Sequence, residues 1–107
     1  MKMITAIINR DDTSAVVGNL TKSGFSVTKL ATTGGFLLAG NTTLLIGVED
    51  EKVDEALAII EEHSKKRSQL VPPVGTSADG AMMSIPIEVT VGGATVFVTN
   101  VETFKKF

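Results

Sequence analysis

A glycine pair with polar and aromatic neighbours is the stretch whose residue types best suit ligand chemistry. Gly34 and Gly35 leave backbone N–H groups unshielded, and successive free amides form a concavity that can hold a phosphate. Phe36 follows directly, and its ring can stack on a nucleobase. Thr28 and Asn41 flank the loop with a hydroxyl and an amide, and the amide matches the adjacent donor and acceptor of an adenine edge. The stretch predicts a site for a small nucleotide.

A plainer interpretation of these residues stays open. A Gly-Gly pair before a strand is typical of a hairpin turn. An isolated phenylalanine in a loop is more often a contact between subunits than a platform for a base. The pattern alone does not decide between a turn and a nucleotide pocket.

Catalytic chemistry is poorly supplied by the rest of the sequence. The chain has no cysteine, which excludes disulfides, thiolate nucleophiles and Cys-ligated metals. His63 is the only histidine, and it stands among Glu61, Glu62, Lys65 and Lys66, a setting typical of a solvated helix surface. No Ser/His/Asp arrangement, metal-ligand cluster or Walker-type loop is present in the sequence. We therefore expect no catalytic residues, no metal and no cofactor.

Composition indicates a single globular domain spanning residues 1–107. Hydrophobic residues make up 43% and charged residues 21% of the chain, which is ordinary for a folded protein. The net charge of −2 lacks the basic footprint expected of a protein that binds long DNA or RNA. The apolar run at residues 3–9 is too short for a signal peptide or a membrane span. We expect a cytoplasmic protein whose nucleotide ligand is small.

The elements that must position these residues follow from apolar periodicity. "MITAIIN" at residues 3–9 predicts a strand, and Asp11 or Asp12 is the expected N-cap of a helix from about residue 13 to 23. Gly24 is expected in the C-terminal cap position of this helix. "FSVTKLATT" alternates, which places on one sheet face the residues Ser26, Thr28, Leu30 and Thr32. The near-continuous apolar run at residues 42–50 predicts a further strand.

The second half predicts a helix, a loop and a hairpin. Residues at helical spacing within "EKVDEALAIIEEHSKK" are Val53, Ala56, Leu57 and Ile60. Residues 72–84 are punctuated by Pro, Gly and Ser, which predicts a long surface loop. Residues 85–91 and 94–98 alternate on either side of Gly92 and Gly93, which predicts a two-residue hairpin turn. The order strand, helix, strand, strand, helix, strand predicts an α+β, ferredoxin-like βαββαβ sandwich with an antiparallel sheet and an extra C-terminal hairpin.

Two helices can cover only one face of such a sheet. Leu30 and half of the apolar run at residues 42–48 must point to the other face. Exposing this apolar surface to water is unfavourable by roughly 25 cal/mol per Å². We therefore expect a homo-oligomer whose subunits cover this face.

One long run of residues resembles a known family. "VTKLATTGGFLLAGNTT" at residues 27–43 resembles "ATKLATTGGFLRAGNTT" of the PII-like cyclic di-AMP receptor proteins, and the likeness extends to "MKMI" at the start and "VGGATVFV" near the end. The resemblance implies a homotrimer of ferredoxin-like subunits that binds cyclic di-AMP in pockets between protomers. It also implies a signal transduction receptor with an unknown downstream protein partner, and not an enzyme.

The resemblance also implies roles for individual residues. Thr28 and Asn41 would engage an adenine edge, Gly47 would leave space for a base, and Phe97 would add an apolar wall. Backbone groups that would line the nucleotide belong to Gly35, Phe36 and Leu37. A loop at about residues 76–84 would correspond to the family's larger loop, which is thought to change order with ligand.

The chain departs from the family pattern at several positions. Ser26 and Leu38 stand where arginine is common, Gly24 where asparagine is common, and Lys106 where glutamine is common. Serine at position 26 removes a charge-assisted hydrogen bond, which is typically worth about 1.5 to 3 kcal/mol. Lys29 and Lys106 are candidates to compensate for this loss. The alternative hypothesis is therefore a PII-like trimeric protein-interaction module in which nucleotide binding is weak or lost.

Overall fold

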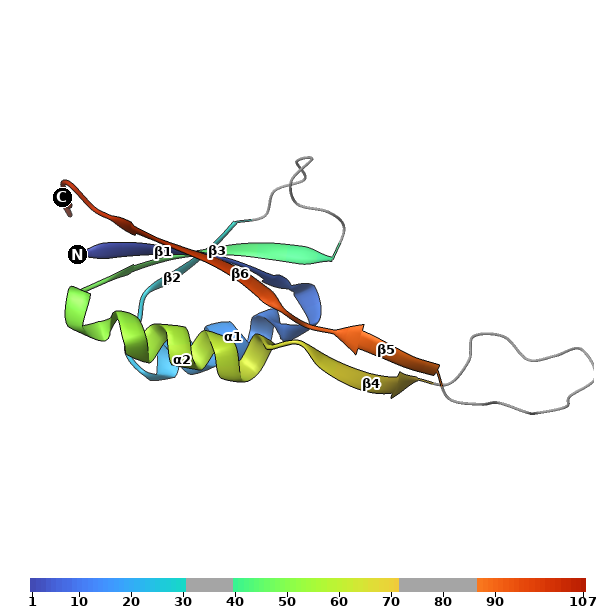
Figure 1. Ribbon diagram of the computed structural model, residues 1–107. Coiled ribbons are helices and arrows are strands. Elements are labelled where there is room, and N and C mark those ends of the chain that lie inside the picture. The colour runs from blue at the N-terminus through green and yellow to red at the C-terminus, as the bar shows by residue number, and fades with distance from the viewer. Residues whose placement is uncertain (31–39, 72–86) are drawn as a thin grey trace, which may run out of the picture.

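The fold is a four-stranded antiparallel sheet with two helices on one face, joined to a separate two-stranded ribbon (Figure 1). The computed structural model describes residues 1–30, 40–71 and 87–107. The elements of the body are β1 (Lys2–Asn9), α1 (Arg10–Lys22), β2 (Val27–Leu30), β3 (Asn41–Val48), a 3-10 turn (Asp50–Lys52), α2 (Val53–Ser64) and β6 (Ala94–Asn100). The ribbon consists of β4 (Arg67–Val71) and β5 (Ile87–Val91). This α+β arrangement is consistent with the ferredoxin-like fold expected from the sequence.

The sheet has the order β2-β3-β1-β6, and its register decides which side chains face the helices. Ile4 lies opposite Ile46 on β3 and Val98 on β6, so these three side chains share one face. The helix-facing residues of the two central strands are buried, and they are Ile4, Ala6, Ile8, Leu44, Ile46 and Val48. The strands predicted at residues 3–9 and 42–50 are therefore confirmed.

Both helices contribute an apolar stripe to this core. Val16 and Leu20 of α1 and Ala56 and Ile60 of α2 have at most 1% of their surface exposed. These spacings of four residues place each pair on one side of its helix, as the sequence predicted. The predicted C-terminal cap of α1 is also confirmed, since Gly24 follows the helix with a φ of 93°.

The N-cap of α1 is Asn9, so the expectation of Asp11 or Asp12 was wrong. The Asn9 side-chain oxygen accepts a hydrogen bond from the backbone N–H of Asp11 at 2.9 Å. The hydroxyl of Thr13 donates to the carbonyl oxygen of Asn9 at 3.2 Å, which closes the same turn. Asp11 and Asp12 lie in the first turn, where a carboxylate is favoured by the helix dipole. The helix therefore begins three residues earlier than the pattern indicated.

The predicted C-terminal hairpin was also wrong. β5 pairs with β4, whereas β6 pairs with β1 of the main sheet. Gly92 and Gly93 lie between the two sheets with φ of 79° and 98°, and the Gly93 N–H donates to the carbonyl oxygen of Ser64 at 2.5 Å. The glycines therefore pass the chain from one sheet to the other. Alternation places side chains on faces but does not identify the partner strand, and β4 itself has too few apolar residues to be predicted.

Candidate functional site

The sheet face opposite the helices carries most of the described candidate residues. Thr28 lies opposite Leu45, Leu45 opposite Thr5, and Thr5 opposite Phe97, so that one row crosses all four strands. Directly opposed residues point to the same face of a sheet. No helix covers this face, as Figure 1 shows. Thr28 and Phe97, to which the family resemblance gave contacts with one ligand, therefore share a surface, and they lie at its two edges, about 14 Å apart by strand spacing.

Gly47 lies in the next row of the same face. It is opposite Met3 of β1, which is in turn opposite Thr99 of β6. A methyl group added at Gly47 would meet no atom within 4 Å among the described residues. Glycine is unfavourable inside a strand, and Gly47 does not have a left-handed backbone; the described residues also leave this space unfilled. The free space above Gly47 is therefore available to a molecule outside the described part of the subunit.

Asn41 lies on the same face but not beside Thr28. It is the first residue of β3, four residues before Leu45, and its side chain is exposed. Four residues of strand correspond to about 13 Å. Thr28 and Asn41 of one subunit are therefore too far apart to contact the same base edge. The sequence could not give this separation because it depends on the pairing of β2 with β3.

The structure separates Lys29 from the other candidates. Lys29 is opposite Leu44, a helix-facing core residue, so its side chain leaves the sheet on the opposite side from Thr28. Ser26, just before β2, lines a surface pocket together with Gly47. The same pocket is lined by charged side chains of both signs, Glu49 and Lys52. Ser26 and Gly47 are therefore brought together, and Lys29 is not.

Three predicted backbone contacts lie outside the described residues. They are those of Gly35, Phe36 and Leu37, within the segment 31–39 that the structure does not describe. The predicted loop at residues 72–84 also lies outside the described part of the chain. After these two segments the described chain resumes at Gly40 and at Ile87.

Thr5 and Leu45 belong to the open face and were not singled out from the sequence. Thr5 lies between Leu45 and Phe97 in the middle of the cross-strand row. The alternation of residues 3–9 puts Thr5 on the same side as Met3 and Ile7, which is a signal present in the sequence. The strand order was needed to show that this side is the open one.

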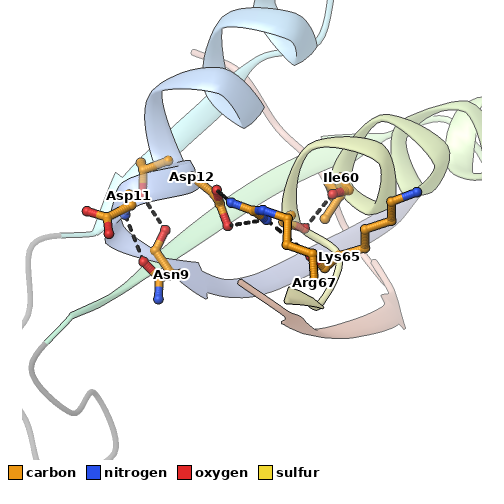
Figure 2. Close-up of polar contacts among 8 residues, drawn as sticks. Asn9, Asp11, Asp12, Ile60, Lys65 and Arg67 are labelled. Carbon is orange, nitrogen blue, oxygen red and sulfur yellow. Dashed lines mark hydrogen bonds and ion pairs between the residues drawn. The ribbon is translucent and has the colours of Figure 1, made fainter. Parts of the chain in front are cut away.

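A polar cluster at the start of α1 joins the body to the ribbon, as Figure 2 shows. The guanidinium of Arg67 donates to both carboxylate oxygens of Asp12, with Nη2–Oδ1 at 2.7 Å and Nη1–Oδ2 at 3.3 Å. Nη1 also donates to the carbonyl oxygen of Lys65 at 3.1 Å. The hydrogen bonds that Arg67 donates to the Asp12 carboxylate raise the pKa of Arg67 above its usual value. Arg67 therefore stays charged, and its role is structural.

With the open face described, the comparison with known families decides the assignment. A family model described as cyclic-di-AMP receptor matches residues 1–107, the whole chain. This chain belongs to the cyclic-di-AMP receptor family. The chain is also similar to the crystal structure of a functionally unknown protein from Pediococcus pentosaceus ATCC 25745, with 40% identity and a TM-score of 0.81. That similarity covers 99% of this chain and 96% of the other.

Membership of the cyclic-di-AMP receptor family assigns the chain to a class of receptors, not of enzymes. The ligand of the family is cyclic di-AMP. Across residues 1–30, 40–71 and 87–107, no three His, Asp or Glu side chains are grouped closely enough to hold a metal ion. Within the same ranges, neither helix combines the length and hydropathy needed to cross a bilayer.

Proposed function

We propose that this protein is a homotrimeric receptor that binds cyclic di-AMP between its subunits and passes occupancy to a downstream protein through its loops. The observation that supports this proposal is the uncovered sheet face, to which Thr28, Gly47 and Phe97 all belong. Membership of the family supports cyclic di-AMP as the ligand. The register of the strands supports the open sheet face as the surface that binds it. The remaining proposed ligand residues are Ser26, Lys29, Gly35, Phe36, Leu37 and Asn41.

The apolar character of the open face supports a site shared between subunits. Phe97 is 51% exposed although it lies in a strand of the main sheet. Leu30, Leu45 and Ile7 face the same side and are only half-buried in the isolated chain. A second subunit on this face would remove these side chains from water, and a base stacked near Phe97 would do so locally. A pocket between subunits therefore suits both the protein and the ligand.

The spacing of the polar groups supports a ligand larger than one base. Thr28 and Asn41 offer a hydroxyl and an amide about 13 Å apart along the strand direction. A dinucleotide carries two adenine edges, so each group can meet an edge of its own. If one adenine contacts both the Thr28 hydroxyl and the Asn41 amide, these two groups come from neighbouring subunits.

Calorimetry with purified protein tests the proposed ligand. We expect binding heat with cyclic di-AMP at tens of micromolar or below, and none with cyclic di-GMP or ATP at the same concentrations. Thr28→Val keeps the shape of the side chain and removes its hydroxyl, so binding should weaken by about 0.5 to 1.5 kcal/mol. Thr90→Val, in the exposed ribbon, is the matched control and should bind as the wild type does. An absence of heat from cyclic di-AMP contradicts the proposal.

The rival function is a protein-interaction module with weak nucleotide binding. The observation that favours it is the pocket beside Ser26, whose lining includes the carboxylate of Glu49, a group that repels a phosphate. Ser26→Arg distinguishes the two functions. A gain in affinity of about tenfold or more in that variant, from a weakly binding wild type, favours the interaction module.

A further inference from the structure

The first turn of α1 contacts two segments that are distant in sequence. The backbone N–H of Arg10 donates to the carbonyl oxygen of Gly40 at 2.5 Å, directly before Asn41. Two residues further along the helix, the carboxylate of Asp12 holds Arg67, the first residue of β4. One helical turn therefore connects the start of β3 to the base of the ribbon.

Both strands of the ribbon converge on Asp12. The Asp12 side chain is only 8% exposed, and Arg67 donates to each of its oxygens. On the β5 side, a methyl group at Gly92 would lie 2.5 Å from Nη1 of Arg67 and 3.2 Å from Oδ2 of Asp12. The chain that leaves β5 thus packs directly against the ion pair. Figure 2 shows the pair between the start of α1 and the end of α2.

The ion pair is suited to having two distinct states. Separating Arg67 from Asp12 would leave a carboxylate with little access to water and without its charged partner, which is strongly unfavourable. The guanidinium, in contrast, is 44% exposed and can be hydrated when released. Two arrangements are therefore favoured over intermediate ones. In the first, Asp12 and Arg67 are paired. In the second, they are separated and the first turn of α1 has moved so that water reaches Asp12.

We propose that the Asp12–Arg67 ion pair couples the start of β3 to the β4–β5 ribbon. A ligand bound at Asn41 restricts the position of Gly40. Gly40 accepts the hydrogen bond from Arg10, so its position affects the first turn of α1. This turn carries Asp12, and its position therefore affects the strength of the ion pair with Arg67. The role of the ligand in this coupling rests on the proposed function. The coupling between the two segments belongs to the fold and is present without ligand.

Amide hydrogen exchange measured by NMR tests the coupling in the ligand-free protein. Arg67→Gln and, separately, Asp12→Asn remove the ion pair with little change in volume. We expect faster exchange in β4 and β5, and exchange of the Arg10 amide faster by roughly fivefold or more. Lys52→Gln removes the exposed 3.5 Å ion pair with Glu55 and should leave the Arg10 amide unchanged. If either Arg67→Gln or Asp12→Asn leaves the exchange rate of the Arg10 amide at its wild-type value, the coupling is overturned.

A second measurement adds cyclic di-AMP to the wild type and to Arg67→Gln. We expect ligand to slow exchange in β4 and β5 of the wild type by roughly fivefold or more, and to have a smaller effect in the variant. Coupling between two sites is reciprocal. The affinity of Arg67→Gln for cyclic di-AMP should therefore differ from that of the wild type by the same factor by which the ligand's effect on ribbon exchange is reduced. An equal ribbon response in both proteins overturns the coupling. Absence of binding by the wild type contradicts the proposed function instead, and the ligand-free exchange then decides the coupling alone.

Discussion

At the scale of single residues, Gly47 is the position that the packing of its own subunit does not explain. It lies inside β3, where glycine adds no side chain to the sheet and weakens the strand. Among the described residues, the glycines with left-handed backbones are Gly24, Gly40, Gly92 and Gly93, so the φ of Gly47 does not require glycine. The described residues leave room for a methyl group at this position. The described residues therefore give no packing reason for a glycine here, and the proposed pocket supplies one.

Gly47→Ala should separate stability from binding. Alanine costs less backbone entropy than glycine, so the free energy of unfolding should rise by roughly 0.5 to 1 kcal/mol. A methyl group in the space proposed for a base should weaken cyclic di-AMP binding by about 1 to 3 kcal/mol, or roughly 5- to 150-fold in Kd. Chemical denaturation and calorimetry on the same preparation measure the two quantities.

Gly18→Ala is the matched control for this prediction. Gly18 is exposed in the middle of α1, and a methyl group there also meets nothing within 4 Å. It should stabilise the protein by about 1 kcal/mol and leave the affinity for cyclic di-AMP unchanged. Unchanged affinity in Gly47→Ala as well would remove Gly47 from the proposed pocket.

The sequence proposed candidate residues but did not give their relative positions. Thr28 and Gly47 lie on one open face, as alternation and the family resemblance together suggested. Lys29 follows Thr28 directly and therefore points to the other face, a consequence of strand geometry that the resemblance alone did not reveal. The distance between Thr28 and Asn41 depends on the register of two strands, and sequence patterns do not specify register.

At the scale of elements, the start of α1 shows why a cap is hard to predict from one sequence. Asn9, Asp11 and Asp12 all carry side-chain oxygens suited to an N-cap. The choice is made by tertiary structure, because Asp12 is paired with Arg67, 55 residues later in the chain. β1 runs up to Asn9, so the helix begins immediately where the strand ends.

Asn9→Ala should destabilise the protein by about 1 kcal/mol, because the N–H of Asp11 loses its side-chain acceptor. Thermal unfolding monitored by circular dichroism measures the effect. Asn9→Ser retains a capping oxygen and should stay within a few tenths of a kcal/mol of the wild type. Equal losses in the two variants would show that Asn9 acts through its packing and not through the cap.

Gly92→Ala should loosen the ribbon more than the body. Its methyl group would lie 2.5 Å from Nη1 of Arg67 and 2.8 Å from the carbonyl oxygen of Lys65. The left-handed φ of 79° adds roughly 1 to 2 kcal/mol of strain for alanine, and the close contacts add about 1 to 3 kcal/mol. Faster amide exchange in β4 and β5 is the expected signature.

Gly24→Ala measures the cost of backbone strain without the close contacts that Gly92→Ala also introduces. Gly24 has a similar φ of 93°, and nothing lies within 4 Å of the added methyl group. Its cost should be limited to about 1 to 2 kcal/mol, measured by denaturation. If Gly92→Ala destabilises the protein no more than Gly24→Ala does, the contact with the ion pair is not important for stability.

At the scale of the whole molecule, the fold class follows from the order of elements, whereas the ribbon does not. Two helices, each after a buried strand, predicted a sheet covered on one face, and the structure agrees with this. The tail was predicted as one hairpin because residues 85–98 alternate around two glycines. β5 and β6 belong to different sheets, since β6 completes the core beside β1 while β5 pairs with the short polar strand β4.

The uncovered face gives the final prediction, on assembly. Leu45 is half-buried on this face, between Thr28 and Thr5 in the cross-strand row. In the proposed trimer, Leu45→Lys would bury an unpaired charge in each subunit, at a cost of several kcal/mol per site. Native mass spectrometry should then detect the mass of one 11.2 kDa chain instead of three.

Leu70→Lys provides the control for assembly, because Leu70 is 66% exposed on the ribbon and lies outside the main sheet. This variant carries the same change in charge and should keep the wild-type mass. Circular dichroism should show that both variants are folded, because neither side chain belongs to the buried core. An intact trimer in Leu45→Lys would show that the open face is not the subunit interface. The proposed pocket between subunits would then have to lie elsewhere, since Thr28 and Leu45 occupy the same row.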